Sequence, residues 1–236
     1  MNLASIPYVD FYVSVIDNYG DMGFAVNLAL SLHEKYPDMV IRFFSDDSGL
    51  FQKFFHENVP DWMEYMPLEI LKHENPVAPS KLICSFFDYP LQKEYLAKFP
   101  YEKTIVAFSC FVLHNGLESL HKTMYLMESG YDTVIHFIPS LVPLGGGIII
   151  NPEIERRKAE LSRMSEIDAR RKFLLEIMDL GKVEGIGDPG SKDELHSICG
   201  KKWISVFVYK DTLEKILPVL ESADSDTVFW VCGDPS

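Results

Sequence analysis

The sequence predicts an α/β protein in which a parallel sheet carries helices on both faces. Two observations lead to this fold class. Short apolar runs that are typical of buried strands alternate along the chain with segments of helical periodicity. The most distinctive segment, residues 12–32, combines a strand, a turn with two glycines and a helix, which is the first half of a βαβ unit.

Composition limits the classes of function. The chain has 236 residues, of which 47% are hydrophobic and 13% aromatic, so it can form a sizeable core in one or two domains. Its formal net charge of −13 argues against binding to nucleic acid, because phosphate contacts need clustered Lys and Arg. An acidic surface would instead attract a basic partner.

Cysteine usage and the length of the apolar runs indicate a cytoplasmic protein. The four cysteines stand far apart and form no C-x-x-C pair, which is typical of reduced thiols: Cys84, Cys110, Cys199 and Cys232. The N-terminus lacks the basic region of a signal peptide. No apolar run reaches the ~20 residues that a membrane helix needs. We therefore expect no membrane partner.

The strand, turn and helix at residues 12–32 place two carboxylates at the edge of the sheet. Residues 12–16 predict a buried strand, and residues 24–32 predict a largely buried helix. Ligands of such folds bind where strands end and helices begin, so Asp17 and Asp21 are expected on the functional edge. This position makes them the candidate catalytic residues.

A purely structural alternative exists for the same turn. Either aspartate could cap the helix, while Gly20 and Gly23 would only permit the turn. Two carboxylates on one turn are less easily explained as caps, and they would repel a phosphate group. The turn therefore favours a cation, or a hydroxyl or nitrogen nucleophile, as its ligand.

The rest of the chain continues the alternation of strands and helices through a first domain, residues 1–180. Further strands are predicted at 40–44, 82–87, 104–108 and 133–137, and further helices at 50–55, 91–99 and 153–180. Residues 57–80 predict a short strand and irregular connections, and residues 111–129 have a less regular pattern. Residues 181–199 are predicted to be a linker. Residues 200–236 begin a second domain, with strands at 204–209 and 227–232 around a helix at 212–220.

Three further regions of the chain hold candidates or alternatives for a site. Asp46 follows the strand at 40–44 and is a candidate ligand-binding residue, whereas Asp47 is better explained as a helix cap. Gly145 and Gly146 lie in a loop that could approach a ligand closely or could simply be flexible. His114 stands four residues from Glu118, but without a motif such as H-E-x-x-H no metal site is expected.

Three sequence motifs carry a resemblance to a known family. Residues 17–23, after a strand, read Asp-Asn-aromatic-Gly-Asp-hydrophobic-Gly, with IRFFSDD following at 41–47. Residues 137–149 read FIPSLVPLGGGII, with an Arg-rich helix predicted at 154–161, and ISVFVY stands at 204–209. The first motif matches throughout the N-terminal signature of the bacterial protein-arginine rhamnosyltransferases of the EarP family. The second is similar to a later family segment and its Arg-rich helix, and the third to the strand that opens the family's second domain.

The resemblance implies both an activity and a fold. Family members transfer rhamnose from dTDP-rhamnose to one arginine of translation elongation factor P, with inversion at the anomeric carbon and without a cofactor or metal. It implies a GT-B-like fold of two Rossmann-like domains, the first binding the acceptor and the second the donor.

The resemblance also extends to residue roles. Asp17 and Asp21 are expected to be catalytic. The expected substrate-binding residues are Asn18, Tyr19, Gly20, Gly23, Asp46, Gly145, Gly146, Phe207 and Tyr209.

The chain departs from the family pattern at several points. It has Val26 and Asn27 where the family usually has a Trp-Arg pair, and Ser140 where the family has Gly. Family members are also considerably longer. We therefore expect the first Rossmann-like domain to be complete and the second only begun, with weak dTDP-rhamnose binding and doubtful activity for this chain alone.

Two other classes of function are open at this stage. A non-catalytic binding module could use the acidic turn to hold a cationic or arginine-bearing partner. A nucleotide-sugar epimerase or dehydrogenase would need G-x-G-x-x-G after the first strand, and the sequence does not have it.

Overall fold

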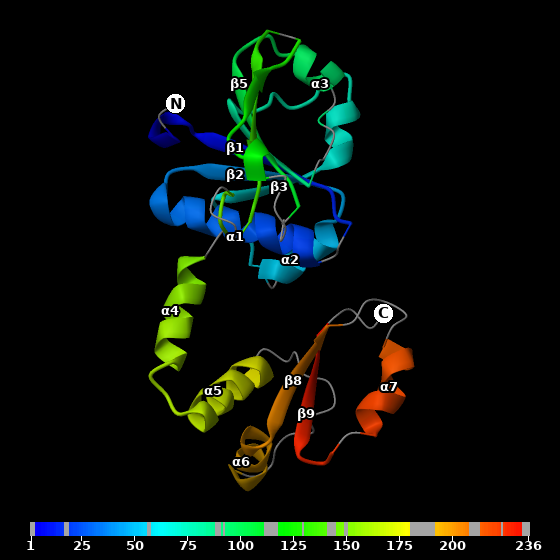
Figure 1. Ribbon diagram of the computed structural model, residues 1–236. Helices are drawn as coiled ribbons and strands as arrows, with labels where there is room; N and C mark the ends of the chain where they lie inside the picture. The colour runs from blue at the N-terminus through cyan, green and yellow to red at the C-terminus, as the bar shows by residue number, and fades with distance from the viewer. Residues whose placement is uncertain are drawn as a thin grey trace. The chain divides into compact units, whose positions relative to one another are not determined.

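The computed structural model describes residues 3–16, 19–55, 58–87, 91, 93–110, 118–128, 130–140, 145–148, 151–179, 192–207, 213–222 and 224–232. The chain divides into two compact units, Met1–Glu155 and Arg156–Ser236, which are described separately (Figure 1). No helix in the described ranges is long and apolar enough to cross a membrane.

The first unit is built on a seven-stranded sheet in the order β3-β2-β1-β4-β5-β7-β6. All neighbouring strands are parallel except β6 and β7, which are antiparallel. The strands are β1 (Tyr8–Val13), β2 (Val40–Ser45), β3 (Met63–Pro67), β4 (Leu82–Phe86), β5 (Lys103–Phe108), β6 (Met124–Leu126) and β7 (Asp132–Phe137). The predicted α/β class with a mostly parallel sheet is confirmed. The order reverses between β1 and β4, which is where doubly wound sheets bind their ligands.

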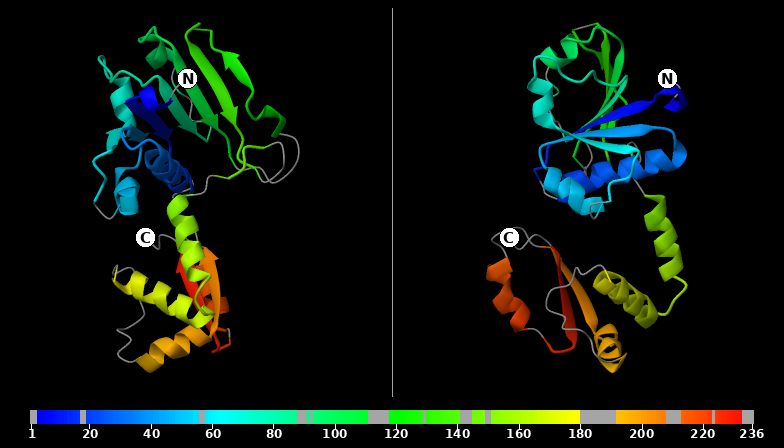
Figure 2. Two further views of the ribbon diagram at one scale, coloured as in Figure 1. Left: turned by 90° about the vertical axis from the view of Figure 1, so that its left-hand side faces the viewer. Right: turned by 180° about the vertical axis from the view of Figure 1, so that it is seen from behind.

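Helices cover both faces of this sheet because the strand residues alternate between two cores (Figure 2). Val9, Phe11 and Val13 of β1 pack with α1 (Tyr19–Lys35) and α2 (Ser48–Phe55). Tyr12 belongs to the opposite core, which includes residues of η2 (Leu68–Lys72) and α3 (Lys93–Ala97). A strand buried on both faces is typical of a parallel sheet.

The boundaries of the first strand and helix differ from the prediction. β1 ends at Val13 instead of Ile16, and α1 begins at Tyr19 instead of Phe24. The apolar side chains of Val15 and Ile16 suggested a longer strand, but Ile16 is 81% exposed. The backbone amides of these two residues donate to aspartate side chains, so they do not continue the parallel ladder.

A buried ion pair joins β1 to β2. The strand register places Asp10 opposite Arg42. Arg42 donates from Nε to Asp10 Oδ1 at 2.7 Å and from Nη2 to Asp10 Oδ2 at 2.9 Å. The backbone amide of Ser80 donates to Asp10 Oδ2 at 2.7 Å. The carboxylate of Asp10 is thus fully buried yet satisfied on both oxygens.

The edge of the first sheet that is formed by β6 is apolar. All three residues of β6 are exposed, and Met124 and Leu126 are 67% and 62% exposed. The sequence pattern did not predict this strand. Three residues are too few to show a period, and exposure on an edge removes the usual alternation of apolar and polar residues.

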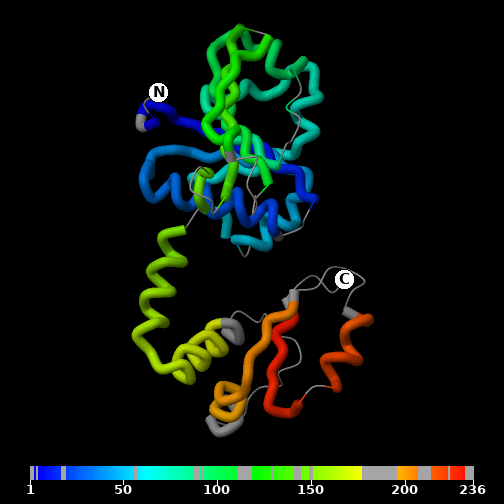
Figure 3. The backbone as a smooth tube through the Cα atoms, in the orientation of Figure 1, coloured from blue at the N-terminus to red at the C-terminus, as the bar shows by residue number. Residues whose placement is uncertain are grey.

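The second unit has a two-stranded parallel sheet of β8 (Lys202–Phe207) and β9 (Thr227–Cys232) (Figure 3). Its helices are α5 (Glu166–Asp179), α6 (Lys192–Gly200) and α7 (Leu213–Glu221), and α4 (Pro152–Leu161) spans the boundary with the first unit. Residues 192–199 of the predicted linker lie in α6, and residues 181–191 lie outside the described residues.

Aromatic rings join α5 to the second sheet. Trp203 and Trp230, on neighbouring strands, have ring centroids 4.9 Å apart, and Phe173 of α5 packs against both rings. Arg170 lies over the ring of Trp203, 5.1 Å from its centroid, and donates to the carbonyls of Cys199 and Lys201. These contacts hold α5 and α6 against β8.

Candidate active site

Two of the acidic residues predicted for the site, Asp21 and Asp46, lie where the chain leaves β1 and β2: Asp46 directly follows β2, and Asp21 is in the first turn of the helix after β1. The register of these parallel strands ends with Val13 opposite Ser45, so both chains leave the sheet at the same edge. The connection from β1 to α1 starts there, with Ser14, Val15 and Ile16. This edge is next to the point at which the strand order reverses.

Asp46, directly after β2, forms hydrogen bonds with this connection. Its Oδ2 accepts a hydrogen bond from the hydroxyl of Ser14 at 2.8 Å. Its Oδ1 accepts one from the backbone amide of Val15 at 2.9 Å. Both oxygens of Asp46 therefore bind residues of the β1–α1 connection.

Asp21 of α1 also binds the β1–α1 connection. Asp21 lies in the first turn of α1, where a negative charge is favourable because of the helix dipole. Its Oδ2 accepts a hydrogen bond from the backbone amide of Ile16 at 2.8 Å, and the residue is only 9% exposed. The consecutive amides of Val15 and Ile16 thus donate to two different carboxylates, Asp46 just after β2 and Asp21 in α1.

The predicted catalytic residue Asp17 lies outside the described residues, as does Asn18. In the chain they directly follow Ile16 and precede Tyr19, the first residue of α1. The side chain of Tyr19 is likewise outside the described part. The structure therefore describes the segments on either side of Asp17.

The two glycines of the motif lie inside α1. Gly20 is exposed in the first turn of the helix. Gly23 faces α2, because a Cβ added there would lie 3.4 Å from Cζ of Phe54. This distance is an ordinary van der Waals contact, so the packing of α1 on α2 does not by itself require glycine at this position.

The predicted glycine loop packs against the end of β7. A Cβ added at Gly146 would lie 2.7 Å from both His121 Cε1 and Phe137 Cζ. The amide of Gly146 donates to the carbonyl of Ile138 at 2.8 Å. Gly146 therefore lies close to side chains of this protein itself. Gly145, which directly precedes it, is half-buried.

His121 forms this contact, which the sequence pattern did not predict. Its Nδ1 accepts a hydrogen bond from the amide of Ile138 at 3.2 Å, and its ring lies edge-on to Phe137. Burial, reinforced by the charge of Lys122, lowers the pKa of His121. A neutral imidazole with an unprotonated Nδ1 fits this hydrogen bond.

The remaining predicted positions lie in or beyond the second sheet. Phe207 is the last residue of β8, and its side chain is outside the described part, as is the whole of Tyr209. Among the described residues, no group of three His, Cys, Asp or Glu could hold a metal ion. His114 and the side chain of Glu118 are outside the described residues.

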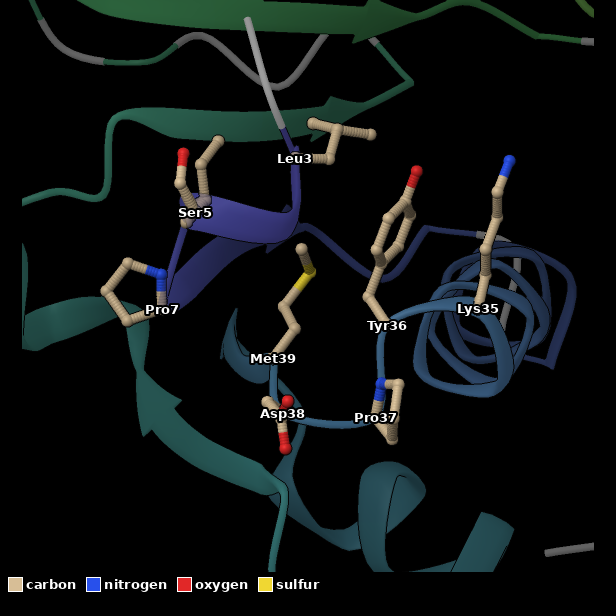
Figure 4. Close-up of a pocket in the computed structure, with 9 residues that line it drawn as sticks. Leu3, Ser5, Pro7, Lys35, Tyr36, Pro37, Asp38 and Met39 are labelled. Atoms are coloured by element: carbon tan, nitrogen blue, oxygen red, sulfur yellow. The ribbon is translucent and has the colours of Figure 1, made fainter.

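Two cavities lie at the opposite edge of the first sheet, where the strands begin. One, of about 460 Å³, is lined by residues before β1 and after α1, among them Leu3, Tyr36 and Met39 (Figure 4). The other, of about 490 Å³, is lined by Ser5–Tyr8 together with Arg42, Ala78, Pro79, Ser80 and Lys81. Neither cavity is lined by a predicted site residue.

These features define an α/β protein of the doubly wound class, with an acidic first βα connection at the edge where such folds bind ligands. The family model described as Elongation-Factor P (EF-P) rhamnosyltransferase EarP matches residues 9–235. The chain belongs to this family of glycosyltransferases, whose acceptor is EF-P. No curated protein matches the chain. The resemblance found in the sequence is confirmed.

Proposed function

We propose that this chain transfers rhamnose from dTDP-rhamnose to an arginine side chain of EF-P, with inversion at the anomeric carbon, and that its turnover alone is low because it binds the donor weakly. The family match supports the acceptor protein and the sugar. The observation that carries the chemistry is the placement of Asp21, and of the residues flanking Asp17, at the carboxyl end of β1.

An arginine acceptor explains why the site is acidic. A guanidinium has a pKa above about 12, so its complete deprotonation before attack would be costly. Carboxylates can instead bind it through charge-assisted hydrogen bonds and accept a proton from the attacking nitrogen. As the C–N bond forms, the bond between the anomeric carbon and the phosphate oxygen of the donor breaks, and dTDP leaves. Asp17 is the residue we assign to this proton transfer. Asp21 contributes negative charge at the same turn while also holding Ile16.

Asn18, Tyr19 and Gly20 complete the proposed acceptor site. We assign Asn18 and Tyr19 to contacts with the acceptor, since an aromatic ring can stack on a guanidinium. Gly20 follows them in the chain and is exposed in the first turn of α1. Phe207 and Tyr209, at the end of β8 and just beyond it, are proposed donor contacts. We propose a GT-B enzyme, with the acceptor domain predicted for residues 1–180 and the donor domain predicted to begin at residue 200. The boundary between the two compact units lies earlier, after Glu155.

Mass spectrometry of EF-P tests this proposal. EF-P is incubated with the purified chain and dTDP-rhamnose, and one deoxyhexosyl group on one arginine is the expected product. EF-P carrying lysine at that arginine is the matched control and should gain no mass. NMR of the product should show an anomeric configuration opposite to that of the donor.

Each result separates the candidate functions. Binding of EF-P without a gain in mass would favour a non-catalytic acidic binding module and overturn the transferase proposal. Transfer from a UDP-sugar but not from dTDP-rhamnose would contradict the assigned donor. Retention of the donor's anomeric configuration would contradict direct inversion.

A further inference from the structure

The connection between β1 and α1 is fixed by side chains at a point where the strand ladder has ended. The last paired residues of β1 and β2 are Val13 and Ser45, so Ser14 stands next to Asp46 across the two strands. In a continuing ladder, backbone carbonyls of β2 would accept the amides of β1. Here the carboxylate of Asp46 accepts the amide of Val15 instead.

Neighbouring aspartates on this edge have different hydrogen-bond partners. Asp47 caps α2, because its Oδ1 accepts the amide of Leu50 at 2.8 Å. Asp46 takes no part in that cap in the described contacts, and its two oxygens bind Ser14 and Val15. Helix capping therefore does not explain Asp46.

We propose that Asp46 is a positioning residue for the transfer reaction, and this inference rests on the proposed function. By holding Ser14 and Val15, it fixes the backbone two residues before Asp17, while Asp21 fixes Ile16. The proposed proton acceptor therefore stands on a connection held by two carboxylates. Asp46 acts through this backbone geometry and makes no contact with the arginine acceptor.

Geometry matters here because small displacements at a reacting centre are costly. A misplacement of about 1 Å can reduce a rate by about 100-fold. Three hydrogen bonds to the segment Ser14–Ile16 restrict such movement. A group that positions the catalytic residue should affect kcat much more than the KM for EF-P.

The test compares Asp46→Ala with Asp46→Asn in the full chain. Asparagine keeps an oxygen that can accept the amide of Val15 but removes the negative charge. We expect Asp46→Ala to lower kcat by about 10- to 100-fold with the KM for EF-P within about twofold of wild type. Asp46→Asn should retain kcat within about threefold. If Asp46 gripped the guanidinium by charge, both variants would raise KM to a similar degree, and the proposal would be overturned.

A second readout does not depend on activity. Hydrogen exchange at the amide of Val15 should be faster in Asp46→Ala than in wild type and nearly unchanged in Asp46→Asn.

Ser14→Ala should lower kcat in the wild-type background and have little further effect in Asp46→Ala, because the hydroxyl then has no carboxylate to bind. Unchanged exchange and wild-type kcat in Asp46→Ala would contradict the positioning role.

Asp47→Ala is the matched control for stability. It removes a helix cap and so destabilises α2, but it leaves the bonds of Asp46 in place. If Asp47→Ala lowered kcat as much as Asp46→Ala, general destabilisation would explain the effect. If the wild-type chain transfers no rhamnose, the proposed function fails, and the exchange at Val15 alone then decides whether Asp46 fixes the connection.

Discussion

Arg42 donates to both carboxylate oxygens of Asp10, at 2.7 and 2.9 Å, from the neighbouring strand of the first sheet. The carboxylate is fully buried, and the side chain of Arg42 is nearly so. Burial nevertheless raises the pKa of Asp10, with Arg42 opposing that shift. The desolvation of Asp10 is therefore only partly offset by its partner, so the sheet is sensitive to loss of Arg42.

We expect Arg42→Met to lower the free energy of unfolding by about 3–5 kcal/mol, because it leaves a buried carboxylate without its cation. Urea denaturation at pH 7 measures this change. Lys81→Met, at an exposed cation near Arg42, is the control and should change the free energy by less than about 0.5 kcal/mol. An equally small effect for Arg42→Met would show that the pair contributes little.

The loss in Arg42→Met should depend on pH. Without Arg42, the folded-state pKa of Asp10 rises further above its unfolded value of about 3.9. A raised pKa means that the folded state binds the proton more tightly, so the variant loses stability as pH rises through this range. The difference from wild type should therefore shrink as the pH is lowered from 7 toward 4. A difference that grows on acidification would contradict this account.

Gly146→Ala should destabilise the first unit. The added Cβ would lie 2.7 Å from both His121 and Phe137, so one of the rings or the backbone must move. Overpacking of this kind costs about 1–3 kcal/mol. Thermal unfolding measures the change. Gly200→Ala is the matched control, because nothing lies within 4 Å of the added Cβ, and it should not destabilise the chain.

His121 should titrate below the usual histidine pKa of about 6.5. Burial lowers its pKa, Lys122 adds to the shift, and the amide of Ile138 donates to the unprotonated Nδ1. Because the folded state binds this proton less tightly, the associated stability is present above about pH 6.5 and is lost as the pH falls through the folded pKa. NMR of the imidazole Hε1 follows the titration. Lys122→Gln should raise the midpoint, and a wild-type midpoint above 6.5 would contradict the prediction.

Asp17 and Asp21 should respond differently to substitution. Asp17→Asn should reduce rhamnosylation of EF-P by about 100- to 10,000-fold, the range for loss of a general base, with normal thermal unfolding. Asp21→Ala should reduce activity and also lower the free energy of unfolding by about 1 kcal/mol, because the amide of Ile16 loses its acceptor. Wild-type turnover in Asp17→Asn would remove Asp17 from the mechanism.

Short apolar runs in the sequence predicted several strands correctly. The apolar runs at residues 104–108 and 133–137 gave β5 and β7, and the prediction for residues 227–232 coincides with β9. The end of β1 was predicted wrongly because Val15 and Ile16 have strand-forming side chains, whereas their amides are taken by carboxylates. One of those carboxylates, Asp46, lies 31 residues away in the sequence from Val15.

The candidate site was predictable only in part for the same reason. The motif at residues 17–23 placed Asp21 at the functional edge, since a strand, turn and helix in sequence define that edge. The contacts of Gly23 with Phe54 and of Gly146 with His121 join residues far apart in the chain. No spacing rule could reveal them.

The exposed strand β6 bears on how the purified protein will behave at high concentration. Natural sheets commonly protect an edge strand with charged residues, because unpaired backbone groups there can recruit another chain into an aggregate. Met124, Tyr125 and Leu126 carry no charge and are exposed. A lysine at Met124 or Leu126 would place a charged gatekeeper on this edge while removing little buried surface. We expect such a variant to stay monodisperse in light scattering at concentrations where the wild type associates.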